Sequence, residues 1–157
     1  MIKYFKIYFV LFVIATLITG CSYKPILYKK NYEFSIEKLE FIGDNEVNYF
    51  IEKRFRNLKN PNQKNKYYLQ IESSKLKNII SNDSKGDPSK LEIIIISKFK
   101  LSNSEKLLFE KKIKVKNNYN NISDKLKLKK YESIIIENLS EKISDNIISS
   151  ITNLNDN

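Results

Sequence analysis

Several residue types on which enzymes and metal proteins depend are absent or rare in this chain. Its 157 residues include no histidine, no tryptophan and one cysteine. Without histidine, Ser-His and Cys-His nucleophilic pairs cannot form, and zinc, haem and copper sites lose their commonest ligand. A single cysteine rules out an intramolecular disulfide. The glutamates of the strand-like runs form no catalytic motif: Glu33, Glu37, Glu40, Glu92 and Glu110. We therefore expect neither an enzyme nor a cofactor-binding protein.

The single cysteine, Cys21, ends an N-terminal segment with the order of a secretory signal. A basic start (Lys3 and Lys6) precedes the apolar run 7–18, and small residues then lead to Cys21. With a cysteine at the cleavage point, the segment resembles the lipobox of bacterial lipoproteins. That resemblance implies removal of residues 1–20 and lipidation of Cys21, which becomes the acylated N-terminus of the mature protein.

Two alternatives to a lipoprotein signal are an uncleaved membrane anchor and a buried core thiol. The twelve residues 7–18 span only about 18 Å as a helix, whereas a bilayer core needs about 30 Å. A core thiol fits poorly because Cys21 borders the signal and lies outside any periodic segment. We expect a signal peptide at 1–20, a lipidated tether at 21–32 and one domain at 33–157.

The chain is basic, with a formal net charge of +10. Without Lys3 and Lys6 the net charge is about +8, carried almost entirely by lysine. An exported protein rarely meets nucleic acid, so we expect anionic lipid head groups, phosphorylated glycolipids or acidic protein surfaces as partners. The alternative is that AT-rich coding, which favours Lys, Asn and Ile, accounts for part of the charge.

The spacing of apolar residues predicts one strand and one helix in the first half of the domain. Residues 33–42 alternate as a strand, with a change of parity that places a bulge or turn near Lys38. A break at residues 43–45 follows, where Asp44 or Asn45 can cap a helix. Apolar positions at helical spacing predict an amphipathic helix over 47–58.

The second half predicts three strands and a long helix. The strands are expected at 66–80, 91–101 and 107–115, with the last two forming a hairpin, and a polar break at 117–121. Ser123 or Asp124 can cap the helix. Its apolar stripe is expected at Leu128, Tyr131, Ile135, Leu139, Ile143, Ile147, Ile151 and Leu154, widened by Ile134, Ile136 and Ile148.

These elements predict an α+β fold of order βαβββα. A two-layer sandwich, with both helices on one face of a mostly antiparallel four-stranded sheet, buries every apolar stripe. The other face of the sheet would carry the lysines of the hairpin.

Three short stretches stand out along the mature chain: residues 21–28 read Cys-Ser-Tyr-Lys-Pro-Ile-Leu-Tyr, residues 67–71 read Tyr-Tyr-Leu-Gln-Ile, and residues 118–120 read Asn-Tyr-Asn with Ser123 after them. Together they resemble the LPS-assembly lipoprotein family, LptE. The first stretch is similar to the start of the mature family members, the second to the family's second strand, and the third to the link before its long helix. The element order of the whole mature chain also agrees with this family.

The resemblance implies an outer-membrane lipoprotein that faces the periplasm and plugs the LptD barrel. Together the pair inserts lipopolysaccharide into the outer leaflet. Ser22 agrees with delivery to the outer membrane, because retention in the inner membrane typically goes with Asp at that position. The alternative is a scaffold subunit of another envelope machine, such as outer-membrane protein insertion. Candidate glycolipid-binding residues are Lys75, Lys77, Lys98, Lys100, Lys112 and Lys114.

Overall fold

The computed structural model describes residues 32–58, 63, 65–104 and 106–155. Cys21, the expected signal segment and the tether up to residue 31 lie outside the described residues, so these assignments stay predictions. The described elements are β1 (Phe34–Gly43), α2 (Asn45–Phe55), a 3-10 turn (Arg56–Leu58), β2 (Asn65–Asn82), β3 (Pro88–Ser102), β4 (Leu107–Asn120) and α3 (Lys125–Asn155). Their order is the predicted βαβββα.

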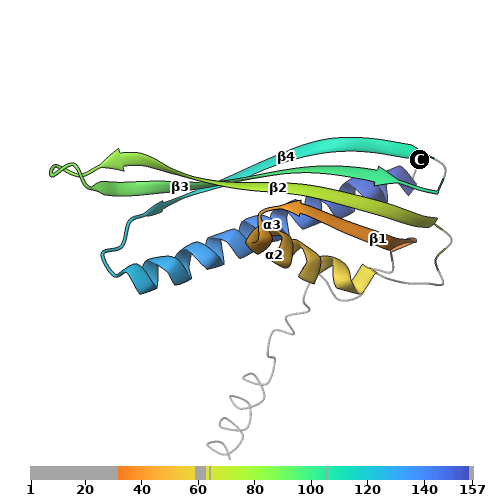
Figure 1. The fold of residues 1–157 in the computed structure, drawn as a ribbon, viewed down its shortest axis with the longest axis horizontal. Coiled ribbons are helices and arrows are strands. Elements are labelled where there is room, and N and C mark those ends of the chain that lie inside the picture. Colours follow the sequence, from red (N-terminus) through yellow and green to blue (C-terminus); the bar gives the residue numbers. More distant parts are fainter. Residues whose placement is uncertain (1–31, 59–62, 64, 105, 156–157) are drawn as a thin grey trace, which may run out of the picture. The chain divides into compact units, whose positions relative to one another are not determined.

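The strands form a four-stranded sheet in the order β1-β2-β3-β4. Both helices lie on the same side of this sheet (Figure 1). The β2–β3 and β3–β4 pairs are antiparallel, whereas β1 runs parallel to β2 because α2 carries the chain back before β2 begins. The α+β fold is confirmed, and its sheet is mixed.

A bulge in β1 decides which side chains leave the core. The register with β2 shifts between Ile36 and Lys38, where the sequence predicts a bulge or turn. Before the shift, Ile36 is buried against the helices; after it, Leu39 and Phe41 pack against the core. The bulge therefore turns Lys38 toward the sheet face away from the helices.

The turn from β1 into α2 depends on one glycine and one aspartate. Gly43 has φ of +97°, and a Cβ at this position would lie 1.9 Å from the carbonyl oxygen of Ser73. Asp44 caps the helix, because its Oδ1 accepts hydrogen bonds from the backbone N–H groups of Glu46 and Val47. The backbone N–H of Asp44 donates to the Ser73 carbonyl at 3.1 Å.

The core lies between the sheet and α3, with α2 beside it. The predicted alternation of β3 is confirmed, with buried Leu91, Ile93, Ile95, Phe99 and Leu101, and Ser97 buried among them. The predicted stripe of α3 is buried at Leu128, Ile135, Ile136, Leu139, Ile143, Ile147, Ile148 and Ile151. Three expected members of the stripe are wrong: Tyr131, Ile134 and Leu154 are 43%, 53% and 40% exposed. Tyr131 contacts the ring of Tyr119 on β4 at a centroid distance of 6.1 Å but stays partly exposed.

The expected polar break at residues 117–121 is also wrong. Strand β4 continues to Asn120, and Tyr119 is 3% exposed, opposite Leu91 of β3. Asparagine has a low strand propensity, but pairing with β3 and burial of Tyr119 overrule it. Asp124 then caps α3, because its Oδ1 accepts from the N–H groups of Leu126 and Lys127.

Candidate functional site

The sheet surface turned away from α2 and α3, called the open face below, gathers lysines from β3 and β4. Lys98 lies directly opposite Lys112 in the β3–β4 register. Lys100 comes two residues after Lys98 on β3, and Lys114 comes two residues after Lys112 on β4. Because the two strands are antiparallel, Lys100 and Lys114 lie on opposite sides of the Lys98–Lys112 pair. All four side chains are exposed. The structure thus brings together four of the six candidate lysines on one surface.

The four lysines differ in how far acidic neighbours neutralise them. Glu110 Oε1 lies 2.8 Å from Lys98 Nζ, and Glu110 Oε2 lies 3.7 Å from Lys100 Nζ. The hydrogen bond from Lys98 lowers the pKa of Glu110, and the same bond raises the pKa of Lys98. Lys112 and Lys114 form no ion pair or hydrogen bond with any described residue. These two cations are available to an anion from outside.

Lys75 and Lys77 lie on the opposite face of the sheet, toward the helices. Lys75 Nζ is 2.6 Å from Glu46 Oε2 and 3.4 Å from Asp44 Oδ2. Lys77 Nζ is 2.5 Å from Glu132 Oε1 on α3. The structure separates both lysines from the other four candidates and gives each a carboxylate partner.

The pKa shifts on this helix side follow from those pairs. Burial by itself would lower the pKa of Lys75, but the Glu46 hydrogen bond and the Asp44 charge outweigh burial and raise it. Burial by itself would raise the pKa of Glu132, but hydrogen bonds from Lys77 and Tyr119 lower it. The Tyr119 hydroxyl donates to Glu132 Oε1 at 2.7 Å. This network joins β2, β4 and α3 and serves the fold.

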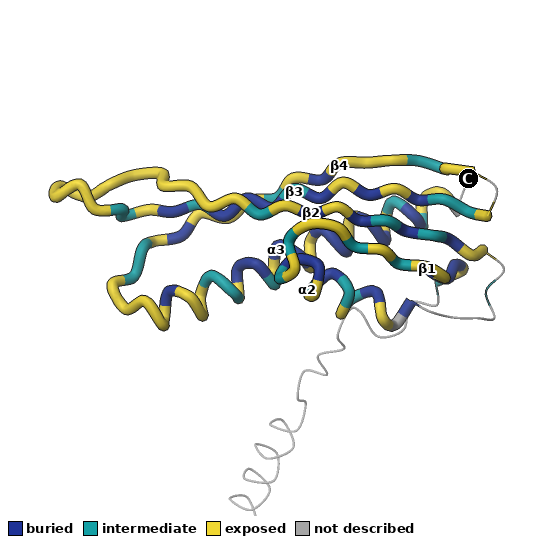
Figure 2. The backbone as a smooth tube through the Cα atoms, viewed as in Figure 1, coloured by how far each residue is buried: buried dark blue, intermediate teal, exposed yellow. Residues whose placement is uncertain are grey.

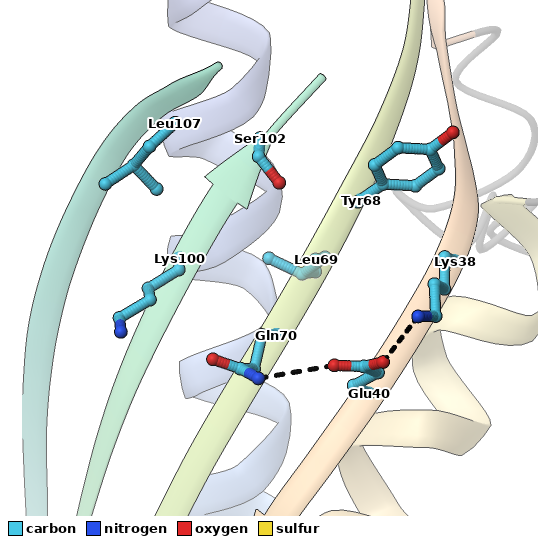
Figure 3. Close-up of a pocket in the computed structure, with 8 residues that line it drawn as sticks. All are labelled: Lys38, Glu40, Tyr68, Leu69, Gln70, Lys100, Ser102 and Leu107. Atoms are coloured by element: carbon cyan, nitrogen blue, oxygen red, sulfur yellow. Dashed lines mark hydrogen bonds and ion pairs between the residues drawn. The ribbon is translucent and has the colours of Figure 1, made fainter. Parts of the chain in front are cut away.

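A shallow hollow on the open face lies beside Lys100, near the β3–β4 turn. It has a volume of about 590 Å³ and is lined by Lys38, Glu40, Tyr68, Leu69, Gln70, Lys100, Ser102 and Leu107 (Figure 3). Glu40 accepts from Gln70 Nε2 at 3.2 Å and lies 2.7 Å from Lys38 Nζ. The sequence interpretation missed Lys38 and Tyr68, although the parity change at the β1 bulge signals that Lys38 faces outward.

Aliphatic side chains accompany the cations of the open face. Ile94 and Ile96 share the parity of Lys98 along β3; Ile96 is partly exposed and lies opposite Lys114, whereas Ile94 is only 8% exposed. Leu76 lies opposite Ile94 on β2 and is 50% exposed. The open face therefore combines unneutralised positive charge with apolar surface, which suits an anionic amphiphile.

The described residues contain no group of three or more His, Cys, Asp or Glu side chains arranged to hold a metal ion. Among the described helices, none is long and apolar enough to cross a membrane.

Comparisons with family models and with curated proteins find no match. Solved structures of bacterial lipoproteins are similar in fold. The crystal structure of the rare lipoprotein B from Shewanella oneidensis is 17% identical, with a TM-score of 0.58 over 75% of this chain and 96% of that chain. The solution structure of an uncharacterized lipoprotein B from Nitrosomonas europaea is 12% identical, with a TM-score of 0.58 over 82% and 91%.

A minor lipoprotein from Acinetobacter baumannii is 11% identical, with a TM-score of 0.51 over 76% of this chain and 92% of that chain. At these identities the likeness establishes the fold, which this chain shares with several bacterial lipoproteins. The chain covers nearly the whole of each neighbour.

Proposed function

We propose that this chain is an envelope lipoprotein that partners an LptD-type barrel and assists insertion of lipopolysaccharide into the outer leaflet. Its role is binding and assembly without catalysis, at the periplasmic face of the outer membrane. The observation that carries the proposal is the conjunction of a lipobox-like segment ending at Cys21 with a fold shared with bacterial lipoproteins. The LptE-like start of the expected mature chain supports the choice of partner.

The open face supports lipopolysaccharide as the ligand. Phosphate groups would meet Lys112 and Lys114, while fatty chains would meet Ile96 and the neighbouring aliphatic surface. Exposed ion pairs contribute only about 0.2–1 kcal/mol each. Apolar contact adds about 0.8 kcal/mol for each buried methylene, so the combination of the two is what gives useful affinity.

The partner is tested by purifying the full lipidated protein from its native envelope in mild detergent. We expect a stoichiometric complex with an LptD-type barrel, detected by quantitative mass spectrometry of the purified complex. Recovery of a different envelope machine, or of the protein with no barrel, contradicts the proposed partner.

The lipid anchor is tested by the substitution Cys21→Ser. Without the thiol the signal segment is expected to stay attached and unlipidated, so the variant should have the mass of the full precursor. The wild type should have the mass of residues 21–157 with its acyl groups, and intact-mass spectrometry distinguishes the two. A wild-type protein at its unprocessed mass would contradict the lipoprotein assignment.

A further inference from the structure

The hollow beside Lys100 is formed by two neighbouring rows of the open face, a row being the residues that lie directly opposite one another across the strands. In the first row Tyr68 lies between Lys38 and Ser102, and Ser102 lies opposite Leu107. The second row runs in the same strand order through Glu40, Gln70, Lys100 and Glu110. Every residue that lines the hollow belongs to a strand (Figure 3), so the pairing of the sheet fixes its shape.

The charges in these two rows are paired with one another. Lys38 Nζ lies 2.7 Å from Glu40 Oε1, and Lys100 Nζ lies 3.7 Å from Glu110 Oε2. The hydrogen bond from Lys38 lowers the pKa of Glu40, so this carboxyl is ionised at neutral pH. The hollow therefore presents charged groups but little net charge.

Uncharged polar groups and one aromatic ring complete the hollow. The hydroxyls of Tyr68 and Ser102 form no hydrogen bond with any residue that the structure describes. The Gln70 amide donates to Glu40 Oε2 at 3.2 Å and keeps further donor and acceptor capacity. A sugar offers many hydroxyls that both donate and accept, together with an apolar C–H face that packs on an aromatic ring. These groups thus match a sugar in kind.

The next two rows toward the β2–β3 hairpin carry the free cations. Lys98 lies between Glu72 and Lys112, and its own charge is paired with Glu110. Lys112, and Lys114 one row further on, form no ion pair with any described residue. A phosphate is therefore expected on the β4 side of these rows.

Aliphatic side chains follow in the same direction. Ile96 lies opposite Lys114 and is partly exposed, and in the next row Leu76 is 50% exposed. Figure 2 shows exposed, intermediate and buried residues alternating along β2 and β3 in this region. Rows on one face are about 6.8 Å apart, so the distance along β2 from Tyr68 to Leu76 is about 27 Å. Over that length the open face changes from uncharged polar groups to free cations and then to aliphatic surface.

We propose that the hollow beside Lys100 binds the outer sugars of a phosphorylated glycolipid, whose acyl chains then point toward the β2–β3 hairpin. Outer sugars, phosphorylated sugars and acyl chains follow one another in such a molecule in the same order as the rows of the open face. The hollow has a volume of about 590 Å³, within the range of small-ligand sites. This inference rests on the proposed binding of lipopolysaccharide and assigns a sugar site and a direction to that ligand.

A phosphate or an acyl chain fits the hollow less well. A phosphate would meet the ionised Glu40, and the cations beside it are already paired. An acyl chain would cover the hydroxyls of Tyr68 and Ser102 without giving either a hydrogen bond, which is unfavourable.

Two ligands that differ only in their outer sugars test the proposal. Rough lipopolysaccharide is compared with lipid A carrying the same phosphates and acyl chains, both binding to the full lipidated protein in detergent. We expect the wild type to bind lipopolysaccharide at least about fivefold more tightly than lipid A. Tyr68→Leu/Gln70→Leu removes the ring and the amide and should reduce this preference below about twofold, with lipid A binding unchanged.

Three further variants serve as controls. Lys112→Glu/Lys114→Glu should weaken binding of both ligands by the same factor, and so should Leu76→Gln, because neither change alters the hollow. Tyr49→Leu changes an exposed tyrosine of α2 and should leave both affinities unchanged. Ser102→Ala removes a single hydroxyl of the hollow and should lower the preference by a smaller factor. Thermal melting of the variants is expected to stay near that of the wild type.

The outcomes separate this inference from the proposed function. A wild type that binds both ligands equally, or a preference that survives both Tyr68→Leu/Gln70→Leu and Ser102→Ala, overturns the sugar site while lipopolysaccharide remains the ligand. A preference that Leu76→Gln abolishes and the hollow variants do not would reverse the direction of the ligand. A wild type that binds neither ligand contradicts the proposed function itself.

Discussion

The two faces of the sheet use the same residue type in different ways. On the helix side, Lys75 and Lys77 are held by carboxylates of the two helices. On the open face, Lys112 and Lys114 have no acidic partner among the described residues. Both lysines on the helix side are used within the fold, whereas on the open face Lys98 and Lys100 share Glu110 and only the charges of Lys112 and Lys114 are free for a ligand among the described residues. Each prediction below tests this division.

The largest effect is expected in the core beneath the helix side. Ile143→Asp places a charge at a position with 0% exposure on α3 and should cost more than about 4 kcal/mol of unfolding free energy. Lys142→Asp, at the neighbouring exposed position, should change the unfolding free energy by less than about 0.5 kcal/mol. Denaturant unfolding measures both, and equal stabilities would contradict the assigned face of α3.

An intermediate effect is expected at the carboxylate that joins three elements. Glu132→Gln keeps the shape but removes the charge that pairs with Lys77, and should cost about 1–2 kcal/mol. Glu141→Gln, at an exposed position of the same helix, is the matched control and should be nearly neutral. If both variants unfold alike, the Lys77–Glu132 pair has no role in stability.

The same variant predicts a pH dependence. The folded-state pKa of Glu132 is lowered from its ordinary value of 4.5, so its charge stabilises the fold above that pH. The stabilisation is lost as the pH falls below 4.5 through the lowered pKa. The difference in stability between the wild type and Glu132→Gln should therefore be constant near neutral pH and shrink in acid. A stability difference between the wild type and Glu132→Gln that grows in acid would contradict a lowered pKa of Glu132.

The parity of each strand predicts which face of the sheet its lysines occupy, but it does not predict the carboxylate partners of Lys75 and Lys77. The alternation of β3 and β4 predicted that Lys98 and Lys112 share the outer face of the hairpin, and the structure places them there. Lys75 and Lys77 have the parity of the buried Leu69, which signals the helix side. Their partners Glu46 and Glu132 are distant in sequence, so the pairs depend on how α2 and α3 settle on the sheet.

Three other features depended on tertiary contacts that local patterns do not carry. The asparagine-rich residues 117–121 have the composition of a break, yet Tyr119 gains a buried site opposite Leu91 and extends β4. Ile134 is apolar and was expected to widen the α3 stripe, yet it is 53% exposed among the described residues. The hollow beside Lys100 needed the pairing of four strands, which periodicity within one strand does not specify.

The smallest effects are expected for single lysine truncations. Lys75→Ala removes a side chain that is 25% exposed and forms ion pairs with the carboxylates of Asp44 and Glu46. The loss should lower the free energy of unfolding by about 1 kcal/mol. Lys114→Ala removes an unpaired, exposed lysine and should cost less than about 0.5 kcal/mol. Thermal melting with both variants in one buffer resolves the order, and a larger loss for Lys114→Ala would contradict the division of faces.

Binding of purified lipopolysaccharide to the full lipidated protein in detergent tests the central claim most directly. The double variant Lys112→Glu/Lys114→Glu is compared with Lys129→Glu/Lys130→Glu, which makes the same change of net charge on exposed residues of α3. We predict at least about fivefold weaker binding for the first variant at low salt, with the gap narrowing as salt screens the charges. Equal binding by the two variants, or equal loss in both, would contradict a glycolipid site on the open face.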